Sequence, residues 1–184
     1  MASSHSQQII SRIRCLKPEK ETILFVEVGV LGGSNAASIL HHCPRVKATL
    51  VDRWSEYPLD DSYRGSEARL PYFSNGKWRG IFKEMIGNLS PYWGRFKIIQ
   101  MDAIEAAPVI PDESQDLVFI DSDHSYEGVK NHVNYWWPKV SSGGWLSGHD
   151  YSWGGVKKAV AEFAQNNTVE FEKSLGDTWW IKKK

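Results

Sequence analysis

The sequence predicts an α/β fold: a doubly wound, mostly parallel sheet with helices on both faces. Two observations support this fold class. Apolar runs that suit buried strands alternate along the chain with segments of helical periodicity, which is the pattern of a parallel sheet covered on both sides. In addition, a glycine-rich turn at 29–33 follows the first apolar run directly and leads into a helix.

Length and composition restrict the fold and its partners. With 184 residues the chain is long enough for one domain with a substantial core and short for two, so we expect a single domain over residues 1–184. Lysine plus arginine equals aspartate plus glutamate at 22 each, which leaves no overall field to attract nucleic acid or an anionic membrane. No apolar run approaches the roughly 20 residues that span a bilayer. We therefore expect neither nucleic acid nor a membrane as a partner.

Two features indicate a reducing, cytoplasmic location. Residues 1–8 lack the basic start and apolar block of a secretion signal. The two cysteines, Cys15 and Cys43, fall in predicted helical segments without the spacing of metal ligands. Both are therefore expected to be free thiols.

The first half of the chain contains two predicted strands and two predicted helices. Apolar residues share one helical face at 7–16, which predicts an amphipathic helix that covers an edge or mouth of the sheet. A buried strand is expected at 23–28. After the glycines, apolar residues recur at helical spacing over 36–43 and predict a helix that ends before Pro44. A second strand is expected at 47–52.

Residues 53–95 are the least regular part of the chain. They mix aromatic, charged and turn-forming residues without a clean period, and a helical pattern is present only from Trp78 to Leu89. A long irregular insertion inside a compact domain is either functional or mobile. The alternative is an ordinary surface loop followed by a packing helix.

Strands and helices alternate again from residue 96 to the C-terminus. Strands are predicted at 96–101, at 116–121 and, after a glycine turn at 143–144, at 145–151. One helix is predicted to end before Pro138, and another is predicted at 155–163. Two closing strands are predicted at 169–173 and 177–182.

The glycine-rich turn has the features of a nucleotide cradle. Glycine allows a tight turn and a close approach of the backbone to a ligand, and the following helix N-terminus leaves free N–H groups. Glu27, Gly29 and Gly33 have the spacing acid-x-G-x-x-x-G, whereas dinucleotide sites require G-x-G-x-x-G. The stretch resembles the first motif of class I S-adenosylmethionine-dependent methyltransferases. This resemblance implies that the turn, with Ser34 and Asn35, holds the amino-acid end of S-adenosylmethionine.

Ionisable residues follow several of the predicted strands. In an open α/β sheet, ligands bind beyond the carboxyl ends of the strands, and parallel strands bring those ends to one edge. A structural protein has little reason to collect charges there, so we expect a functional site built from these residues: Glu27, Asp52, Asp102, Asp121, His124, His149 and Asp150.

Linked motifs in the second half of the chain narrow the resemblance. Asp121 and His124 lie in Phe-Ile-Asp-Ser-Asp-His-Ser-Tyr-Glu-Gly-Val, and His149 and Asp150 lie in Gly-Gly-Trp-Leu-Ser-Gly-His-Asp-Tyr. Together with a Gly-Val-Lys-Lys-Ala-Val segment, they resemble the small O-methyltransferase-like branch that includes macrocin-type sugar O-methyltransferases. The resemblance extends from about residue 22 to the C-terminus, except over 53–95. It implies a Rossmann-like methyltransferase fold that ends in an antiparallel hairpin.

Spacing and resemblance together suggest roles for the residues that bind the cofactor's nucleoside. Asp52 lies about 20 residues beyond the glycines, where a carboxylate reaches ribose hydroxyls in doubly wound nucleotide sites. Arg53 is its neighbour in the expected site. The resemblance implies that Asp102, with Ala103, binds the adenine. The alternatives are that Asp52 caps the next turn and that Asp102 is only a helix N-cap.

The resemblance also implies catalytic and metal-binding roles. His124 corresponds to a general base, and an ordinary histidine pKa of about 6.5 suits that task. Metal-dependent members hold Mg²⁺ with an acid equivalent to Asp121 and an acidic pair equivalent to His149 and Asp150. Here His149 departs from the pattern, because imidazole suits Mn²⁺ and other transition metals better than Mg²⁺. A divalent metal, Mg²⁺ or Mn²⁺, is therefore one expectation, and the alternative is that His149 and Asp150 orient substrate or bond within their loop.

The expected function is methyl transfer from S-adenosylmethionine to a hydroxyl of a small molecule such as a sugar or natural product. In a methyltransferase of this size, 53–95 is the natural place for a substrate-recognition or lid region. Three rival functions remain: an NAD-dependent oxidoreductase, which the glycine spacing disfavours; a cofactor-binding protein without catalysis; and a nucleic-acid methyltransferase, which the neutral charge disfavours. Homo-oligomerisation is left open.

Overall fold

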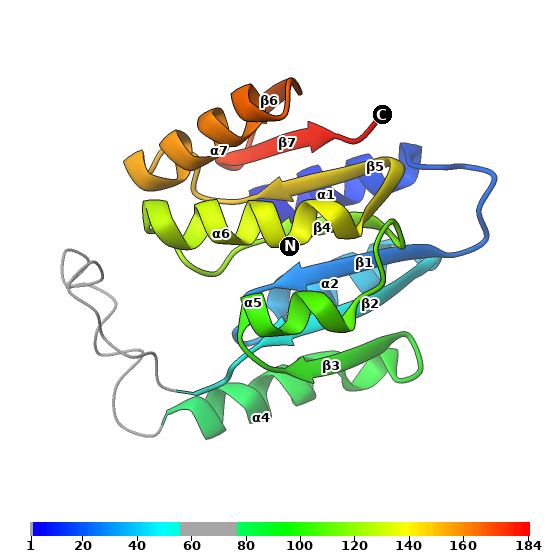
Figure 1. Cartoon of the computed structure of the whole chain (residues 1–184). Coiled ribbons are helices and arrows are strands. Elements are labelled where there is room, and N and C mark those ends of the chain that lie inside the picture. The colour runs from blue at the N-terminus through cyan, green and yellow to red at the C-terminus, as the bar shows by residue number, and fades with distance from the viewer. Residues whose placement is uncertain (1, 56–76) are drawn as a thin grey trace.

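The computed structural model describes residues 2–55 and 77–184, and its central element is one seven-stranded sheet. The strands lie in the order β3-β2-β1-β4-β5-β7-β6 (Figure 1). Their bounds are β1 Ile23–Val28, β2 Val46–Asp52, β3 Phe96–Gln100, β4 Gln115–Ile120, β5 Val140–Gly148, β6 Phe171–Ser174 and β7 Thr178–Lys182. The predicted α/β class, with a mostly parallel sheet and a closing antiparallel hairpin, is confirmed.

Helices join most of the strands. Their bounds are α1 Ser4–Cys15, α2 Ser34–His42, α4 Trp78–Leu89, α5 Ala103–Ala106, α6 Tyr126–Trp136 and α7 Gly154–Asn166, with short 3₁₀ turns η2 Ser90–Tyr92, η3 Ala107–Val109 and η4 Trp137–Lys139. No helix in the described part of the chain is long and apolar enough to cross a membrane.

The sheet is parallel from β3 to β5, and β7 is antiparallel to both of its neighbours, β5 and β6. In Figure 1 the arrowheads of β1, β3 and β5 point the same way and that of β7 points back. Every residue of β4 is buried, as expected for a central parallel strand covered on both faces. The carboxyl ends of the parallel strands therefore meet at one edge of the sheet.

Two hydrophobic layers fill the space between the sheet and its helices. One layer holds the apolar faces of α1, α2 and α4, and the other holds those of α5, α6 and α7. Successive strand side chains alternate between them: Phe25 belongs to the first layer and Val26 to the second. The doubly wound arrangement follows from this alternation, because each face of the sheet needs its own cover of helices.

Several predicted boundaries differ from the structure by a few residues; the fifth strand, for example, was predicted at 145–151 and is found at Val140–Gly148. Two of the differences have a clear cause. Helix α1 begins at Ser4 rather than at residue 7, because the Ser3 side chain accepts a hydrogen bond from the Ser6 N–H and caps the helix. The glycines at 143–144 do not form a turn before the fifth strand but lie inside β5, beside an irregularity in its pairing with β4. A side chain at Gly144 would lie only 2.7 Å from the Asp116 carbonyl oxygen.

The insertion 53–95 is described only in part. Helix α4 has the predicted bounds and packs Met85 and Leu89, both fully buried, into the layer that holds α2. Residues 56–76 lie outside the described residues, so the predicted lid or substrate-recognition role of this stretch stays a prediction.

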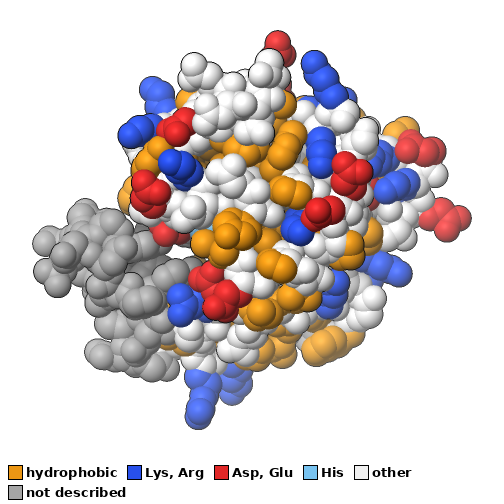
Figure 2. All heavy atoms as spheres, viewed as in Figure 1, with side chains coloured by type: hydrophobic (Ala, Val, Ile, Leu, Met, Phe, Trp, Pro, Cys, Tyr) orange, Lys and Arg blue, Asp and Glu red, His pale blue; other side chains and the backbone are white. Residues whose placement is uncertain are grey.

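The surface reflects the neutral composition. Figure 2 shows Lys and Arg side chains interspersed with Asp and Glu side chains over the described face, with hydrophobic side chains between them. Mixed charge of this kind gives no broad positive field on this face.

Candidate functional site

The candidate site lies at the carboxyl edge of the parallel strands. Backbone hydrogen bonds continue the sheet just past the strand ends: the Gly29 N–H donates to Val51 (2.9 Å), the Asp121 N–H donates to Val28 (2.7 Å) and the His149 N–H donates to Ile120 (3.1 Å). These bonds hold the segments that follow β1, β4 and β5 side by side. The site residues are thus positioned by the most rigid part of the fold.

The turn after β1 is shaped so that only glycine fits. Gly29 has φ +88°, and a Cβ there would collide with the backbone of Asp121, just past the end of the neighbouring strand β4. Gly33 has φ +73° and precedes α2 without any side-chain cap, so the first N–H groups of that helix are left for another acceptor. The turn therefore has the form of a cradle for a ligand.

Glu27 is the most deeply buried acid at this edge. It is 1% exposed, and its Oε1 accepts a hydrogen bond of 2.9 Å from Asn35 Nδ2. Its Oε2 has no hydrogen-bond partner within the described residues. Burial raises the pKa of Glu27 to about 8, with a further rise from the charges of Asp121 and Asp52 and an opposing effect from Asn35. A buried acid with one unpaired oxygen is suited to receive a positively charged group.

Asp52 has a backbone role beside its predicted ribose role. Its Oδ2 accepts from the N–H groups of Val30 and Leu31, each at 2.9 Å, and its Oδ1 accepts from the Trp54 N–H. Leu31 and Trp54 both have positive φ, at 51° and 44°, so this carboxylate holds a strained loop in place. The predicted ribose contact stays a prediction.

The predicted adenine-binding residues gather after β3. Asp102 caps α5, since its Oδ1 accepts from the Ile104 N–H at 2.8 Å, and this confirms that it serves as an N-cap. Its Oδ2 lies 3.6 Å from Arg53 Nη1, so two residues that were predicted separately meet here. Ala103 follows directly and accepts from the Trp136 indole. Contact with adenine stays a prediction.

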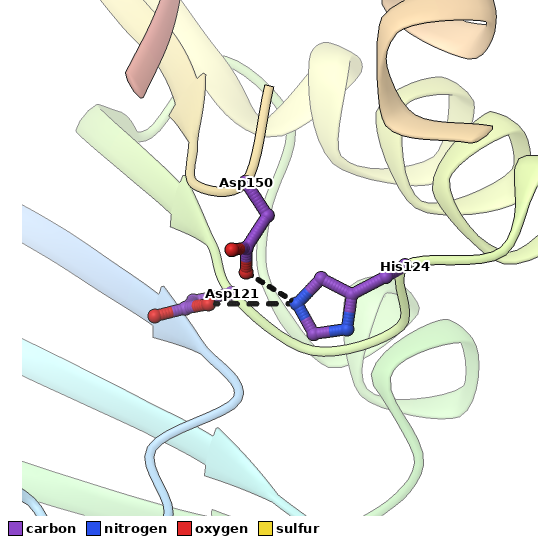
Figure 3. Close-up of side chains that lie close together, drawn as sticks. All are labelled: Asp121, His124 and Asp150. Atoms are coloured by element: carbon purple, nitrogen blue, oxygen red, sulfur yellow. Dashed lines mark ion pairs between the residues drawn. The ribbon is translucent and has the colours of Figure 1, made fainter. Parts of the chain in front are cut away.

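Two acids and two histidines converge where β4 and β5 end. His124 Nε2 lies 2.6 Å from Asp150 Oδ2 and 4.0 Å from Asp121 Oδ1, as Figure 3 shows. His149 Nδ1 lies 3.1 Å from the same Asp150 oxygen and 3.7 Å from Asp121 Oδ1. One ligand atom each from Asp121, His124 and Asp150 lies within 4.8 Å of the others, close enough to share a metal ion. This group contains His124, which was not among the predicted metal ligands, and does not include His149, which was.

The electrostatics of this cluster favour charged carboxylates beside charged or metal-bound partners. Burial raises the pKa of Asp150, but His124 and His149 lower it more, and the pKa lies well below its ordinary range. Burial lowers the pKa of His149, but the contact with Asp150 and the charge of Asp121 more than offset it, and the pKa lies above its ordinary value. The cluster is therefore suited to hold a cation or a proton.

Local hydrogen bonds fix the two loops that carry the cluster. Asp123 Oδ1 accepts from the Ser125 N–H at 2.7 Å, and Ser125 in turn caps α6. On the other loop, Asp150 has φ +55°, and Asp177 Oδ1 accepts from the Ser152 N–H at 2.9 Å. These contacts hold His124 and Asp150 from opposite sides.

Three site neighbours were not predicted from the sequence. His5 on α1 lies against His149 with ring centroids 4.6 Å apart, and burial together with His149 lowers the pKa of His5 to about 4. Trp153 lies beside His124 with ring centroids 5.1 Å apart and is partly exposed. Ser6 is joined to Glu27 through Asn35. None belongs to a motif, so no local signal identifies them.

A small pocket lies beneath the cluster. It is lined by the polar loop after β4 and by apolar side chains of α6, α7 and β7: Ile120, Asp121, Ser122, Asp123, His124, Val129, His149, Val156 and Trp179. In this structure the pocket has room for about one water molecule.

Comparisons with known proteins agree with this architecture. A model described as a methyltransferase domain matches residues 26–151. The solved O-methyltransferase NovP is 19% identical, with a TM-score of 0.73 over 97% of this chain and 79% of NovP. A Staphylococcus aureus protein assigned as a caffeoyl-CoA O-methyltransferase is 14% identical, with a TM-score of 0.67 over 96% of this chain and 81% of its own. The calicheamicin methyltransferase CalS11 is 12% identical, with a TM-score of 0.64 over 97% of this chain and 79% of CalS11. At these identities the likeness shows the fold, and no curated protein sequence matches the chain.

Proposed function

Because the chain belongs to the methyltransferase domain family, we propose that it transfers a methyl group from S-adenosylmethionine to a hydroxyl of a small molecule. The observation that carries this proposal is the convergence of Asp121, His124 and Asp150 at the edge where the glycine cradle also opens. A base and a cofactor cradle at one sheet edge are what such a reaction requires.

The residues of the cradle fit the cofactor. Glu27 offers a buried, unpaired carboxylate oxygen to its amino group, and the uncapped N-terminus of α2 offers N–H groups to its carboxylate. Asp52 and Arg53 are proposed to hold the ribose, and Asp102 with Ala103 the adenine. When bound, S-adenosylmethionine supplies an electrophilic methyl group on a positively charged sulfur.

His124 is the proposed general base. The acceptor hydroxyl becomes a better nucleophile as it loses its proton. His124 Nε2 holds its hydrogen toward the ionised Asp150, which leaves the lone pair of Nδ1 to take the proton. As the hydroxyl oxygen bonds to the methyl carbon, the bond from that carbon to sulfur breaks and its electron pair stays on the sulfur. The negative charge of Asp150, whose Oδ2 lies 2.6 Å from Nε2, stabilises the imidazolium that results. Asp121 lies at 4.0 Å and adds to the same field.

The second candidate role of the cluster is divalent metal binding. A bound metal lowers the pKa of a hydroxyl that it coordinates. As the proposed base, His124 keeps its Nε2 hydrogen on Asp150, so this nitrogen has no lone pair for a metal. We therefore assign Asp121, His149 and Asp150 as the metal ligands, and the imidazole favours Mn²⁺ over Mg²⁺.

The proposed acceptor is a small hydroxylated molecule, a sugar or natural product of the kind that macrocin-type enzymes methylate. Two of the solved structures with this fold are described as O-methyltransferases, and one as a calicheamicin methyltransferase. The exposed Trp153 beside His124 offers an apolar face to such a molecule. The neutral charge disfavours nucleic acid.

The first test is calorimetric titration with S-adenosylmethionine, S-adenosylhomocysteine and NAD, each with and without Mn²⁺ or Mg²⁺. We expect the two sulfur compounds to bind and NAD not to bind. If neither sulfur compound binds, the methyltransferase proposal is wrong.

The second test separates the base from the metal ligand. His124→Ala should leave S-adenosylhomocysteine affinity nearly unchanged and lower methyl transfer to a hydroxyl acceptor by about 10²- to 10⁴-fold. His149→Ala should instead weaken Mn²⁺ binding, measured by titration of the metal alone. The exposed His42→Ala is the matched control. If His124→Ala abolishes metal binding and His149→Ala does not, the two histidines have the opposite roles.

A further inference from the structure

The first turn of α1 reaches the cofactor cradle through a chain of buried polar groups. Ser6 is 1% exposed, and its hydroxyl donates to Asn35 Oδ1 at 2.6 Å. Asn35 is 7% exposed, and its Nδ2 donates to Glu27 Oε1 at 2.9 Å. Ser6 and Glu27 are thus joined by two hydrogen bonds through Asn35 of α2, although 20 residues of the chain lie between them.

The direction of these bonds is set by the chemistry of each group. When a cationic ligand ionises Glu27, the carboxylate accepts only, so Asn35 must turn its NH₂ toward Glu27 and its carbonyl oxygen away. Ser6 donates to that carbonyl oxygen and so favours this orientation of the amide over the flipped one. The Ser3 hydroxyl, 2.6 Å from Ser6 Oγ, is then the donor to Ser6.

As a result, one carboxyl oxygen of Glu27 is hydrogen-bonded and the other has no partner within the described residues. Oε1 is fixed by Asn35, whereas Oε2 is buried and has no hydrogen-bond partner within the described residues. A buried polar atom without a partner is costly, and it is tolerated where a ligand completes the site. Gly29, two residues further on, begins the glycine turn, so the ligand of that turn is the candidate partner for this oxygen.

We propose that Ser6 is a positioning residue, which acts through Asn35 to aim the free oxygen of Glu27 at the positively charged amino group of the cofactor's amino-acid end. The proposal rests on the proposed function for the identity of that cofactor. It assigns to the N-terminal helix a part in cofactor recognition, beyond its part in the hydrophobic core. It also predicts that α1 affects the binding of the amino-acid end of the cofactor and not of the rest of the molecule.

The experiment compares two ligands that differ at this portion. S-adenosylhomocysteine carries the amino-acid end, and 5′-methylthioadenosine lacks it. We expect Ser6→Ala to raise the Kd of S-adenosylhomocysteine by about three- to tenfold, the scale of one oriented hydrogen bond. The Kd of 5′-methylthioadenosine should not change. Alanine is a good helix former, so this variant should keep α1 folded.

Ser38→Ala is the matched control. It removes another buried serine hydroxyl, from the same helix as Asn35, and that hydroxyl has no hydrogen-bond partner within residues 2–55 and 77–184. It should leave both affinities unchanged.

A double-mutant cycle tests whether Ser6 acts through Asn35. Asn35→Ala should weaken S-adenosylhomocysteine binding by itself, and Ser6→Ala should have no further effect in the Asn35→Ala background. Additive losses would overturn the proposal, as would equal losses for both ligands or a Ser6→Ala variant that binds like Ser38→Ala. If the unmutated protein does not bind S-adenosylhomocysteine at all, the proposed function itself fails, which is a distinct result.

Discussion

Glu27 is the residue at which burial and charge conflict most strongly. It is almost fully buried, it receives one hydrogen bond, and the acids Asp52 and Asp121 lie nearby. These surroundings raise its pKa to about 8, so without a ligand the carboxyl holds its proton at neutral pH. A cationic ligand would reverse this preference, because an opposite charge favours the ionised form.

We predict a pH-dependent stability from Glu27. Its pKa is about 8 in the folded chain and about 4.5 when exposed, so between these values the folded state binds the additional proton. Stability from this group is present at low pH and is lost as pH rises through about 8. Glu27→Gln removes this titrating carboxyl group, and with it the pH dependence that the group gives to stability. Its free energy of unfolding relative to the unmutated protein should rise between pH 5 and pH 9 by at least about 1.4 kcal/mol, the value of one pKa unit.

Urea unfolding at a series of pH values measures this effect. The exposed Glu170→Gln is the control, and its difference from the unmutated protein should not depend on pH in this range. A constant difference for Glu27→Gln would show that Glu27 does not titrate as described.

At the scale of elements, carboxylates tie loops to the two ends of the sheet. At the carboxyl edge, Asp52 holds the loop after β1, and Asp177 holds the loop after β5. At the opposite edge, Asp116 at the start of β4 lies 2.8 Å from Lys17 Nζ and 2.7 Å from Lys20 Nζ, and accepts from the Leu24 N–H. The second group joins α1 to the sheet without contributing to the site.

Asp116→Ala should therefore destabilise the fold and spare ligand binding. The Asp116 side chain is fully buried and its loss leaves Lys17 without its partner carboxylate, so we expect a loss of about 3 kcal/mol. Lys20 is 41% exposed and can turn to solvent, which keeps the cost at the low end for a buried pair. Burial opposes ionisation of Asp116, but the two lysines lower its pKa overall, so this stability should also fade on acidification.

Denaturant titration of Asp116→Ala measures the loss, with Asp112→Ala as control. Asp112 also pairs with a lysine, Lys139, but it is 65% exposed and its removal should cost at most about 1 kcal/mol. Equal effects of the two substitutions would contradict the structural role of Asp116. The Kd of S-adenosylhomocysteine should be the same in both variants.

At the scale of the whole molecule, the candidate site spans both halves of the sheet. Glu27 and Asp52 belong to the half that contains α1, α2 and α4 in sequence order, and Asp121 and Asp150 come from the half that follows. A ligand in contact with both halves binds the folded state and not the unfolded chain, so its binding energy adds to the stability of the fold.

S-adenosylhomocysteine should therefore raise the melting temperature. At 100 times its Kd the gain is about 2.7 kcal/mol, which corresponds to a rise of about 5 to 10 °C for a chain of this length. Differential scanning calorimetry at several ligand concentrations measures the rise, with NAD as the control ligand. A melting temperature that does not depend on S-adenosylhomocysteine would contradict the proposed site.

The sequence by itself determined the order and type of most elements. Strands such as 23–28 and helices such as Trp78–Leu89 are encoded in local apolar periodicity, so their positions follow from short stretches of chain. The ends of parallel strands must share an edge, and this rule predicts that Glu27, Asp121 and Asp150 meet at one site. Two of the bounds that were wrong, at the start of α1 and at Gly143–Gly144, depend on a cap and on strand pairing rather than on periodicity.

Only the tertiary structure decided how the site residues contact one another. The approach of His124 to Asp150, the bond from Ser6 to Asn35 and the packing of His5 on His149 join segments that are distant in the chain. The hydrogen bonds from the loop after β1 to Asp52 could not be predicted from the sequence either, because they depend on the path of that loop. To predict a side-chain contact of this kind, the distance between two groups must be known more precisely than the length of a hydrogen bond. Such distances are set by the packing of the whole sheet and its two layers of helices.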